Sequence, residues 1–207
     1  MEKQQNYIDD LSEIRNIMER SSRFVSLSGL SGILVGLYAL IGAYMAYKTF
    51  YFSDELIYSR LRDGVISTNV IKLVAIAFVV LILALGSAIG LSYRKAKKNG
   101  LPIWDNTAKL LFVNLFIPLI SGGIFIVIMF SKGAIGLVAP STLLFYGLAL
   151  VNASKYTFND IRYLGIAEIA LGLMSAYFIG YGLLFWAIGF GVLHIIYGLW
   201  MYFKYEK

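Results

Sequence analysis

Between Arg162 and Lys204 the chain reads YLGIAEIALGLMSAYFIGYGLLFWAIGFGVLHIIYGLWMYF, 41 residues whose only formal charge is Glu168. A single helix of that length would extend about 60 Å, roughly twice the thickness of the apolar core of a bilayer. The run therefore predicts two helices that fold back on each other. We expect the turn at Gly180-Tyr181-Gly182, because its two glycines permit backbone conformations that other residues resist.

Four earlier runs lack charged residues and are also long enough to cross a bilayer, at about 20 residues each: 24–47, 73–93, 110–131 and 133–154. The last run adds spans at about 162–179 and 183–203. The chain is therefore predicted to be an all-α integral membrane protein, with a six-transmembrane-helix bundle in residues 24–207. Residues 1–23 form a cytoplasmic N-terminal segment, in which apolar residues at helical spacing predict a short amphipathic helix over residues 7–20.

The basic residues predict the orientation of the bundle. If the N-terminus is cytoplasmic, thirteen of the 18 lysines and arginines lie on the cytoplasmic side, including the cluster Arg94 to Lys98. Basic residues concentrate on the cytoplasmic side of membrane proteins, so both termini are expected there, in the cytoplasmic (inner) membrane of a bacterium. The net charge of +6 then reflects helix ends next to a lipid bilayer, and we expect no nucleic-acid partner.

The composition leaves little scope for catalysis. The chain contains no cysteine and a single histidine, which excludes disulfides and thiolate metal sites. One histidine and one carboxylate within the spans do not complete a tetrahedral metal site. We therefore assign no metal ligand, no cofactor and no catalytic residue from the residue pattern.

Ionisable side chains within membrane spans are costly and often functional, and the spans contain two of them, Glu168 and His194. Counted from the same membrane face, they lie at depths of about 10 Å and 13 Å, so adjacent antiparallel helices can pair them. Asn114 lies at about 9 Å. We predict that these three residues bind a ligand or a proton in the cytoplasmic half of the bundle. Further polar residues at similar depth are predicted to line the same site: Ser28, Ser31 and Asn152.

Two backbone features complete the prediction. Pro118, Gly122 and Gly123 mark an expected break in the third span, where a bend or an unwound turn would free carbonyl groups, as in transporters. Small residues four apart predict surfaces for close helix packing: Ser28, Gly32 and Gly36, then Gly86 and Gly90, then Ala187 and Gly191.

Three functions remain open. The first is a bundle that binds or transports a small solute, linked to a proton at Glu168 and His194. The second is a regulatory or scaffold protein that contacts a cytoplasmic protein partner through residues 7–20. The third is an intramembrane hydrolase. Gly29-Leu30-Ser31-Gly32 together with His194 resembles the Gly-x-Ser-Gly serine and histidine base of rhomboid proteases, and that resemblance implies Ser31 as a nucleophile, although rhomboids carry this serine on their fourth helix.

Overall fold

The structure is a computed structural model that describes residue 24 and residues 27–51, 68–100 and 104–207. The amphipathic helix predicted over residues 7–20 lies outside the described residues. Within the described ranges every regular element is helical. This agrees with the all-α prediction, because a chain with long apolar runs and few polar side chains satisfies its backbone groups most simply within helices.

The α-helices, in chain order, are α2 (Gly29–Tyr51), α4 (Thr68–Lys98), α5 (Asn106–Ser131), α6 (Val138–Ala153), α7 (Asp160–Tyr177), α8 (Gly182–Trp186) and α9 (His194–Tyr205). Two short 3-10 segments, η1 (Ile135–Leu137) and η2 (Ser154–Tyr156), flank α6, and a π-helical segment, η3 (Ala187–Leu193), joins α8 to α9. Five helical stretches in the described part of the chain are long and apolar enough to cross a membrane. Helix α7, which covers most of the span predicted at 162–179, has 18 residues, includes Glu168 and is not one of these five.

The chain reverses direction between α7 and α8. Helix α7 ends at Tyr177, and Gly180 has a φ angle of 107°, a conformation that side-chain-bearing residues rarely adopt. Helix α8 begins two residues later, at Gly182. The turn expected from the two glycines is therefore present, and it divides the long apolar run into two antiparallel arms.

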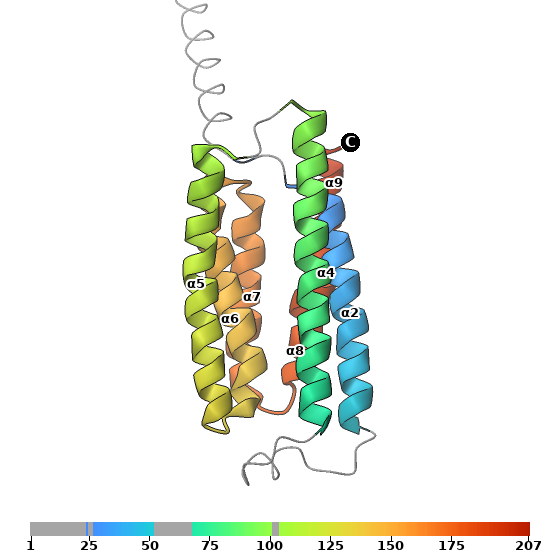
Figure 1. Cartoon of the computed structure of the whole chain (residues 1–207), viewed down its shortest axis with the longest axis vertical. Coiled ribbons are helices and arrows are strands. Elements are labelled where there is room, and N and C mark those ends of the chain that lie inside the picture. Colours follow the sequence, from blue (N-terminus) through green and yellow to red (C-terminus); the bar gives the residue numbers. More distant parts are fainter. Residues whose placement is uncertain (1–23, 25–26, 52–67, 101–103) are drawn as a thin grey trace, which may run out of the picture.

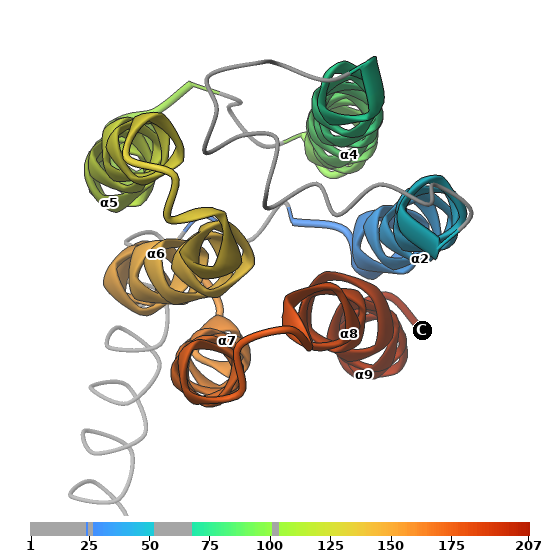
Figure 2. The same ribbon diagram turned by 90° about the horizontal axis from the view of Figure 1, so that it is seen from below.

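The long helices lie side by side along the long axis of the molecule (Figure 1). Seen along that axis, α5, α6 and α7 form one group, and α2, α4, α8 and α9 form another (Figure 2). Helix α6 packs against both α5 and α7, and α2 packs against both α4 and α9. The two groups meet where α6 and α7 contact α8 and where α7 contacts η3.

Most basic residues of the described chain lie at one end of the bundle, which we call the basic end. Helices α2, α5 and α7 begin at this end and helices α4 and α9 finish there (Figure 1). The basic residues of these helix ends and of η2 are Arg94, Lys95, Lys97, Lys98, Lys109, Lys155, Arg162, Lys204 and Lys207. At the opposite end, the described residues include Lys48, Lys72 and Lys132.

Glycines bring two helix pairs into backbone contact. A Cβ atom on Gly36 of α2 would lie 2.6 Å from the carbonyl oxygen of Gly191, and one on Gly147 of α6 would lie 2.6 Å from that of Gly165. The packing surfaces predicted around Gly36 and Gly191 are thus confirmed. The surface predicted at Gly86 and Gly90 is not used within the described bundle, because no atom lies within 4 Å of a Cβ placed at either position. Helix α4 packs mainly on α2 and leaves those glycines open.

Candidate functional site

The two ionisable residues of the predicted site lie together in the core. Glu168 on α7 is fully buried, and His194, the first residue of α9, is 4% exposed. The Nδ1 atom of the histidine lies 3.5 Å from Oε1 of the glutamate. Similar depth on antiparallel helices suggested this pairing, and the turn at Gly180 allows it because it folds α9 back along α7.

A third residue, Tyr146 on α6, completes the site. Its hydroxyl oxygen lies 2.8 Å from Nε2 of His194. The rings of the two residues are 5.4 Å apart, and Phe190 packs against both of them. Sequence reasoning missed Tyr146, because one tyrosine among 15 in an apolar chain carries no signal that sets it apart.

The hydrogen bonds define the protonation of the neutral histidine. Nδ1 lies 3.0 Å from the carbonyl oxygen of Gly189. A carbonyl group only accepts, so Nδ1 carries a hydrogen atom and donates it to Gly189. In the neutral ring Nε2 is therefore the acceptor, and Tyr146 donates its hydroxyl hydrogen to it. This assignment follows from the partners of each nitrogen.

The π-helical segment η3 forms one wall of the site. It supplies the Gly189 carbonyl that His194 binds, and its glycine lets the chain approach the glutamate. A Cβ on Gly189 would collide with Oε2 of Glu168 and would lie 2.6 Å from a methyl group of Leu143. Short π-helical segments are rare and occur often at functional sites. Nothing in the sequence marked this segment in advance.

Neither oxygen of Glu168 accepts a hydrogen bond. The 3.5 Å separation from Nδ1 is short enough for an ion pair, but the Nδ1 hydrogen is directed at Gly189. An unpaired charge in such a place costs several kcal/mol, so the pair is electrically neutral in one of two ways. Either both side chains are uncharged, or the carboxylate faces an imidazolium. The two states differ in the position of one proton, which lies either on the carboxyl group of Glu168 or on the ring of His194.

Asn114 does not join this site, and the break expected at Pro118, Gly122 and Gly123 does not occur. Helix α5 continues through all three residues, and Gly122 serves instead to receive the ring of Phe145 from α6. Proline lacks the N–H that would bind the Asn114 carbonyl one turn earlier.

The side chain of Asn152 on α6 replaces that missing donor. Its amide nitrogen lies 2.9 Å from the carbonyl oxygen of Asn114. The side-chain amide of Asn114 itself donates to the carbonyl of Leu110 on its own helix, at 2.8 Å. The helix stays regular because a neighbouring helix satisfies the carbonyl that proline leaves free.

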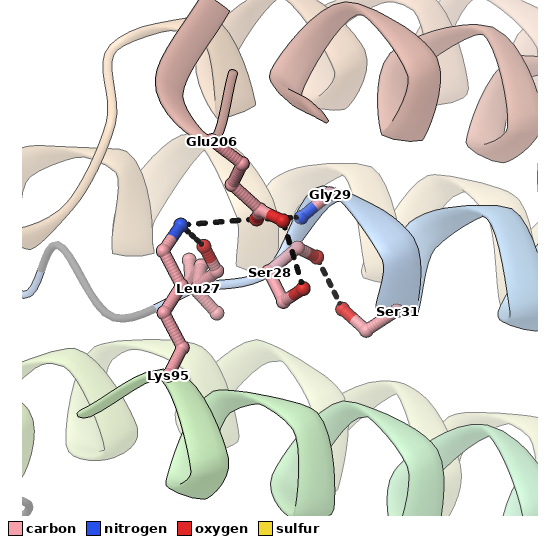
Figure 3. Close-up of polar contacts among 6 residues, drawn as sticks. All are labelled: Leu27, Ser28, Gly29, Ser31, Lys95 and Glu206. Atoms are coloured by element: carbon pink, nitrogen blue, oxygen red, sulfur yellow. Dashed lines mark hydrogen bonds and ion pairs between the residues drawn. The ribbon is translucent and has the colours of Figure 1, made fainter. Parts of the chain in front are cut away.

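Ser28 and Ser31 belong to a second polar cluster, at the basic end (Figure 3). Glu206 accepts a hydrogen bond of 2.6 Å from the backbone amide of Gly29 and pairs with Lys95 at 3.0 Å. Lys95 also donates to the carbonyl of Leu27 at 2.7 Å. We call this cluster of Glu206, Lys95, Ser28 and the Gly29 amide the Glu206 clasp. It ties the start of α2 to the ends of α4 and α9, and a carboxylate there complements the positive end of the α2 dipole.

The catalytic pair of the hydrolase hypothesis is not formed. The hydroxyl of Ser31 donates to the carbonyl of Ser28 at 2.6 Å. The ring nitrogens of His194 are engaged by Tyr146 and by Gly189. A serine nucleophile requires a hydrogen-bonded base, so the resemblance to rhomboid proteases does not extend to their chemistry.

A third polar cluster joins α7 to α9 at the surface of the basic end. Asp160, which precedes the span predicted at 162–179, accepts hydrogen bonds from Lys204 at 2.9 Å and from the hydroxyl of Tyr205 at 2.7 Å. Burial raises the pKa of the Asp160 carboxyl, but the hydrogen bonds from Lys204 and Tyr205 outweigh this effect and hold its pKa below the ordinary value.

Comparison of the chain with known protein families, with curated proteins and with solved structures finds no match. Among the described residues there is also no group of three or more histidine, aspartate or glutamate side chains that could hold a metal ion. A functional proposal therefore has to come from the geometry around Glu168.

Proposed function

We propose that this chain is a six-helix integral membrane protein that holds one proton among Glu168, His194 and Tyr146. In this proposal, uptake or release of that proton is linked to the binding or transport of a small solute. The observation that supports it is a fully buried carboxyl group without a hydrogen bond, 3.5 Å from an imidazole ring. Ionisable groups inside membrane proteins are rare, and they commonly mark proton or solute pathways.

The proposed topology has the basic end in the cytoplasm and both chain termini on that side, in the inner membrane of a bacterium. The unequal distribution of lysine and arginine between the two ends of the bundle supports this orientation. The exposed apolar side chains of α4 and α5 would then face lipid, including Phe78, Ile89, Ile117 and Val127.

Coupling follows from the charge balance of the pair. Gain or loss of one proton leaves a net charge in a low-dielectric interior, where an unpaired charge is expensive. Such a change is favourable only if a compensating ion or polar solute binds, or if the site opens to water. A solute that binds one protonation state better than the other would therefore shift the proton equilibrium, and the proton would shift solute affinity by the same factor.

Infrared titration of the purified protein in detergent tests the proton site. A protonated carboxyl group absorbs separately from a carboxylate, and subtraction of the Glu168→Gln spectrum isolates the Glu168 signal. We expect this signal to change with pH and to be altered in His194→Ala, while Tyr163→Phe, whose side chain is exposed, leaves it unchanged. A Glu168 signal that stays the same at every pH where the protein is folded would make the pair a structural contact and refute the proposal.

The solute is tested separately by thermal stabilisation. Purified protein is heated with a panel of small ions, amino acids and sugars across about pH 5 to pH 8, the range in which histidine commonly titrates. We expect at least one compound to stabilise the wild type in a pH-dependent way and to lose that effect in His194→Ala. If no compound in the panel has this effect, solute binding is refuted, whereas the proposed proton site stands.

A further inference from the structure

Few buried side-chain polar atoms in the described structure lack a hydrogen-bond partner, and most of them lie on α7 and α9. They are both carboxyl oxygens of Glu168, the hydroxyl of Ser175 and the hydroxyl of Tyr197, together with one isolated case on α4, Ser92. Native proteins leave few such atoms, and ordered water commonly satisfies them. Three of these four residues lie on α7 and α9: Glu168 belongs to the proposed proton site, Tyr197 lies one turn from His194, and Ser175 lies about 10 Å along α7 from Glu168.

On α7 the two unpaired residues, Glu168 and Ser175, lie on one face of the helix. Asp160 is its first residue, Glu168 lies about 12 Å further along the axis, and Ser175 lies about 10 Å beyond Glu168. Glu168 and Ser175 are seven residues apart, so they share a face, and both are completely buried. Ser175 approaches the far turn, since its hydroxyl oxygen lies 3.9 Å from where a Cβ on Gly182 would be.

On α9, Tyr197 is the buried polar residue nearest the basic end that lacks a hydrogen-bond partner. Tyr197 lies one turn beyond His194, its hydroxyl is buried, and its side chain packs against a cluster that includes Ile161 and Leu164, which lie on α7 between Asp160 and Glu168. Lys204 and Tyr205 bind Asp160 at the surface. Along α9, Tyr197 therefore lies between His194 of the proposed proton site and the two residues that bind Asp160.

We propose that Tyr197 and Ser175 are the two arms of a water-filled proton path along α7 and α9, which connects Glu168 to Asp160 at the basic end and to the Gly182 turn at the other end. This inference rests on the proposed function, since it supplies the proton for that site. In each arm the hydroxyl oxygen accepts a proton from a water molecule on one side and releases its own hydrogen to a water molecule on the other. The hydroxyl group is therefore unchanged after each transfer.

The rate at which the Glu168 carboxyl exchanges hydrogen for deuterium tests the path. Purified protein in detergent is transferred from H2O to D2O, and the shift of the Glu168 infrared signal is followed over time. The variants are Tyr197→Phe, Ser175→Ala and their double variant. The matched control is the double variant of Tyr163→Phe and Ser121→Ala, whose side chains are exposed.

We expect the double variant to exchange at least about tenfold more slowly than the wild type, because each arm loses a hydrogen-bonding relay group. Each single variant slows exchange less, since the other arm remains open, and the control exchanges at the wild-type rate. Wild-type exchange in the double variant would overturn the path and leave the proton site intact. A single variant as slow as the double variant would overturn the end-to-end path, because only one arm would then exist. If the wild-type protein shows no infrared signal that can be assigned to Glu168, both the proton site and the path are overturned.

Discussion

The contact between Asn152 and the Asn114 carbonyl predicts a measurable dependence on Pro118. Asn152→Ala removes a hydrogen bond of 2.9 Å whose acceptor has no alternative donor, because Pro118 lacks an N–H group. Side-chain hydrogen bonds between membrane helices contribute about 0.6 kcal/mol on average and up to about 1.7 kcal/mol. An acceptor left unpaired raises the cost, so we expect Asn152→Ala to lower the free energy of unfolding by about 1–2 kcal/mol.

Asn152→Ala should lower the free energy of unfolding by much less when residue 118 has an N–H group. Pro118→Ala restores the donor that the Asn114 carbonyl lacks, so loss of the Asn152 amide then leaves that carbonyl paired within its own helix. The double-mutant cycle should therefore show a coupling energy of at least about 0.5 kcal/mol. Unfolding by SDS in mixed micelles, followed by circular dichroism, measures all four proteins.

Asn159→Ala is the matched control, because this exposed asparagine makes no side-chain capping bond. It should change the free energy of unfolding little in either background. An equal cost of Asn152→Ala with proline and with alanine at position 118 would refute the reasoning, since the carbonyl would then not depend on the amide of Asn152.

Three further predictions use the same unfolding measurement. Gly198→Ala should cost about 1–3 kcal/mol, because its Cβ would lie 2.7 Å from the Gly29 carbonyl oxygen, whereas Gly86→Ala, with nothing within 4 Å, should cost nothing. Glu206→Gln should cost about 1 kcal/mol by weakening the pair with Lys95 and the charge at the start of α2, and added salt should reduce that difference. Because the pKa of Asp160 is lowered in the folded protein, its stabilising effect is complete above its ordinary pKa and is lost as the pH falls through the folded pKa. Asp160→Asn should therefore flatten the loss of stability that sets in below about pH 5 and continues as the pH falls below the ordinary aspartate pKa of about 4.

The sequence predicted the helices better than the site. Apolar runs and the two glycines around Tyr181 located the helical segments and the turn, because both signals are local. The pairing of Glu168 with His194 was also predictable, since equal depth on antiparallel neighbours needs only helix geometry. Asn114 shares that depth, yet its amide binds its own helix and its carbonyl binds Asn152. Depth alone does not show which way a side chain faces.

What the sequence determined by itself is an all-helical chain with five or six helices long and apolar enough to cross a membrane. The physical reason is that each helix satisfies its own backbone groups, so length and hydrophobicity are sufficient signals. Only the tertiary structure decided that Tyr146 and the Gly189 carbonyl meet His194, that Asn152 lets α5 pass unbroken through Pro118, and that Glu206 clasps α2. Those contacts depend on the rotation of each helix about its axis, which is set by close glycine packing between helices distant in sequence.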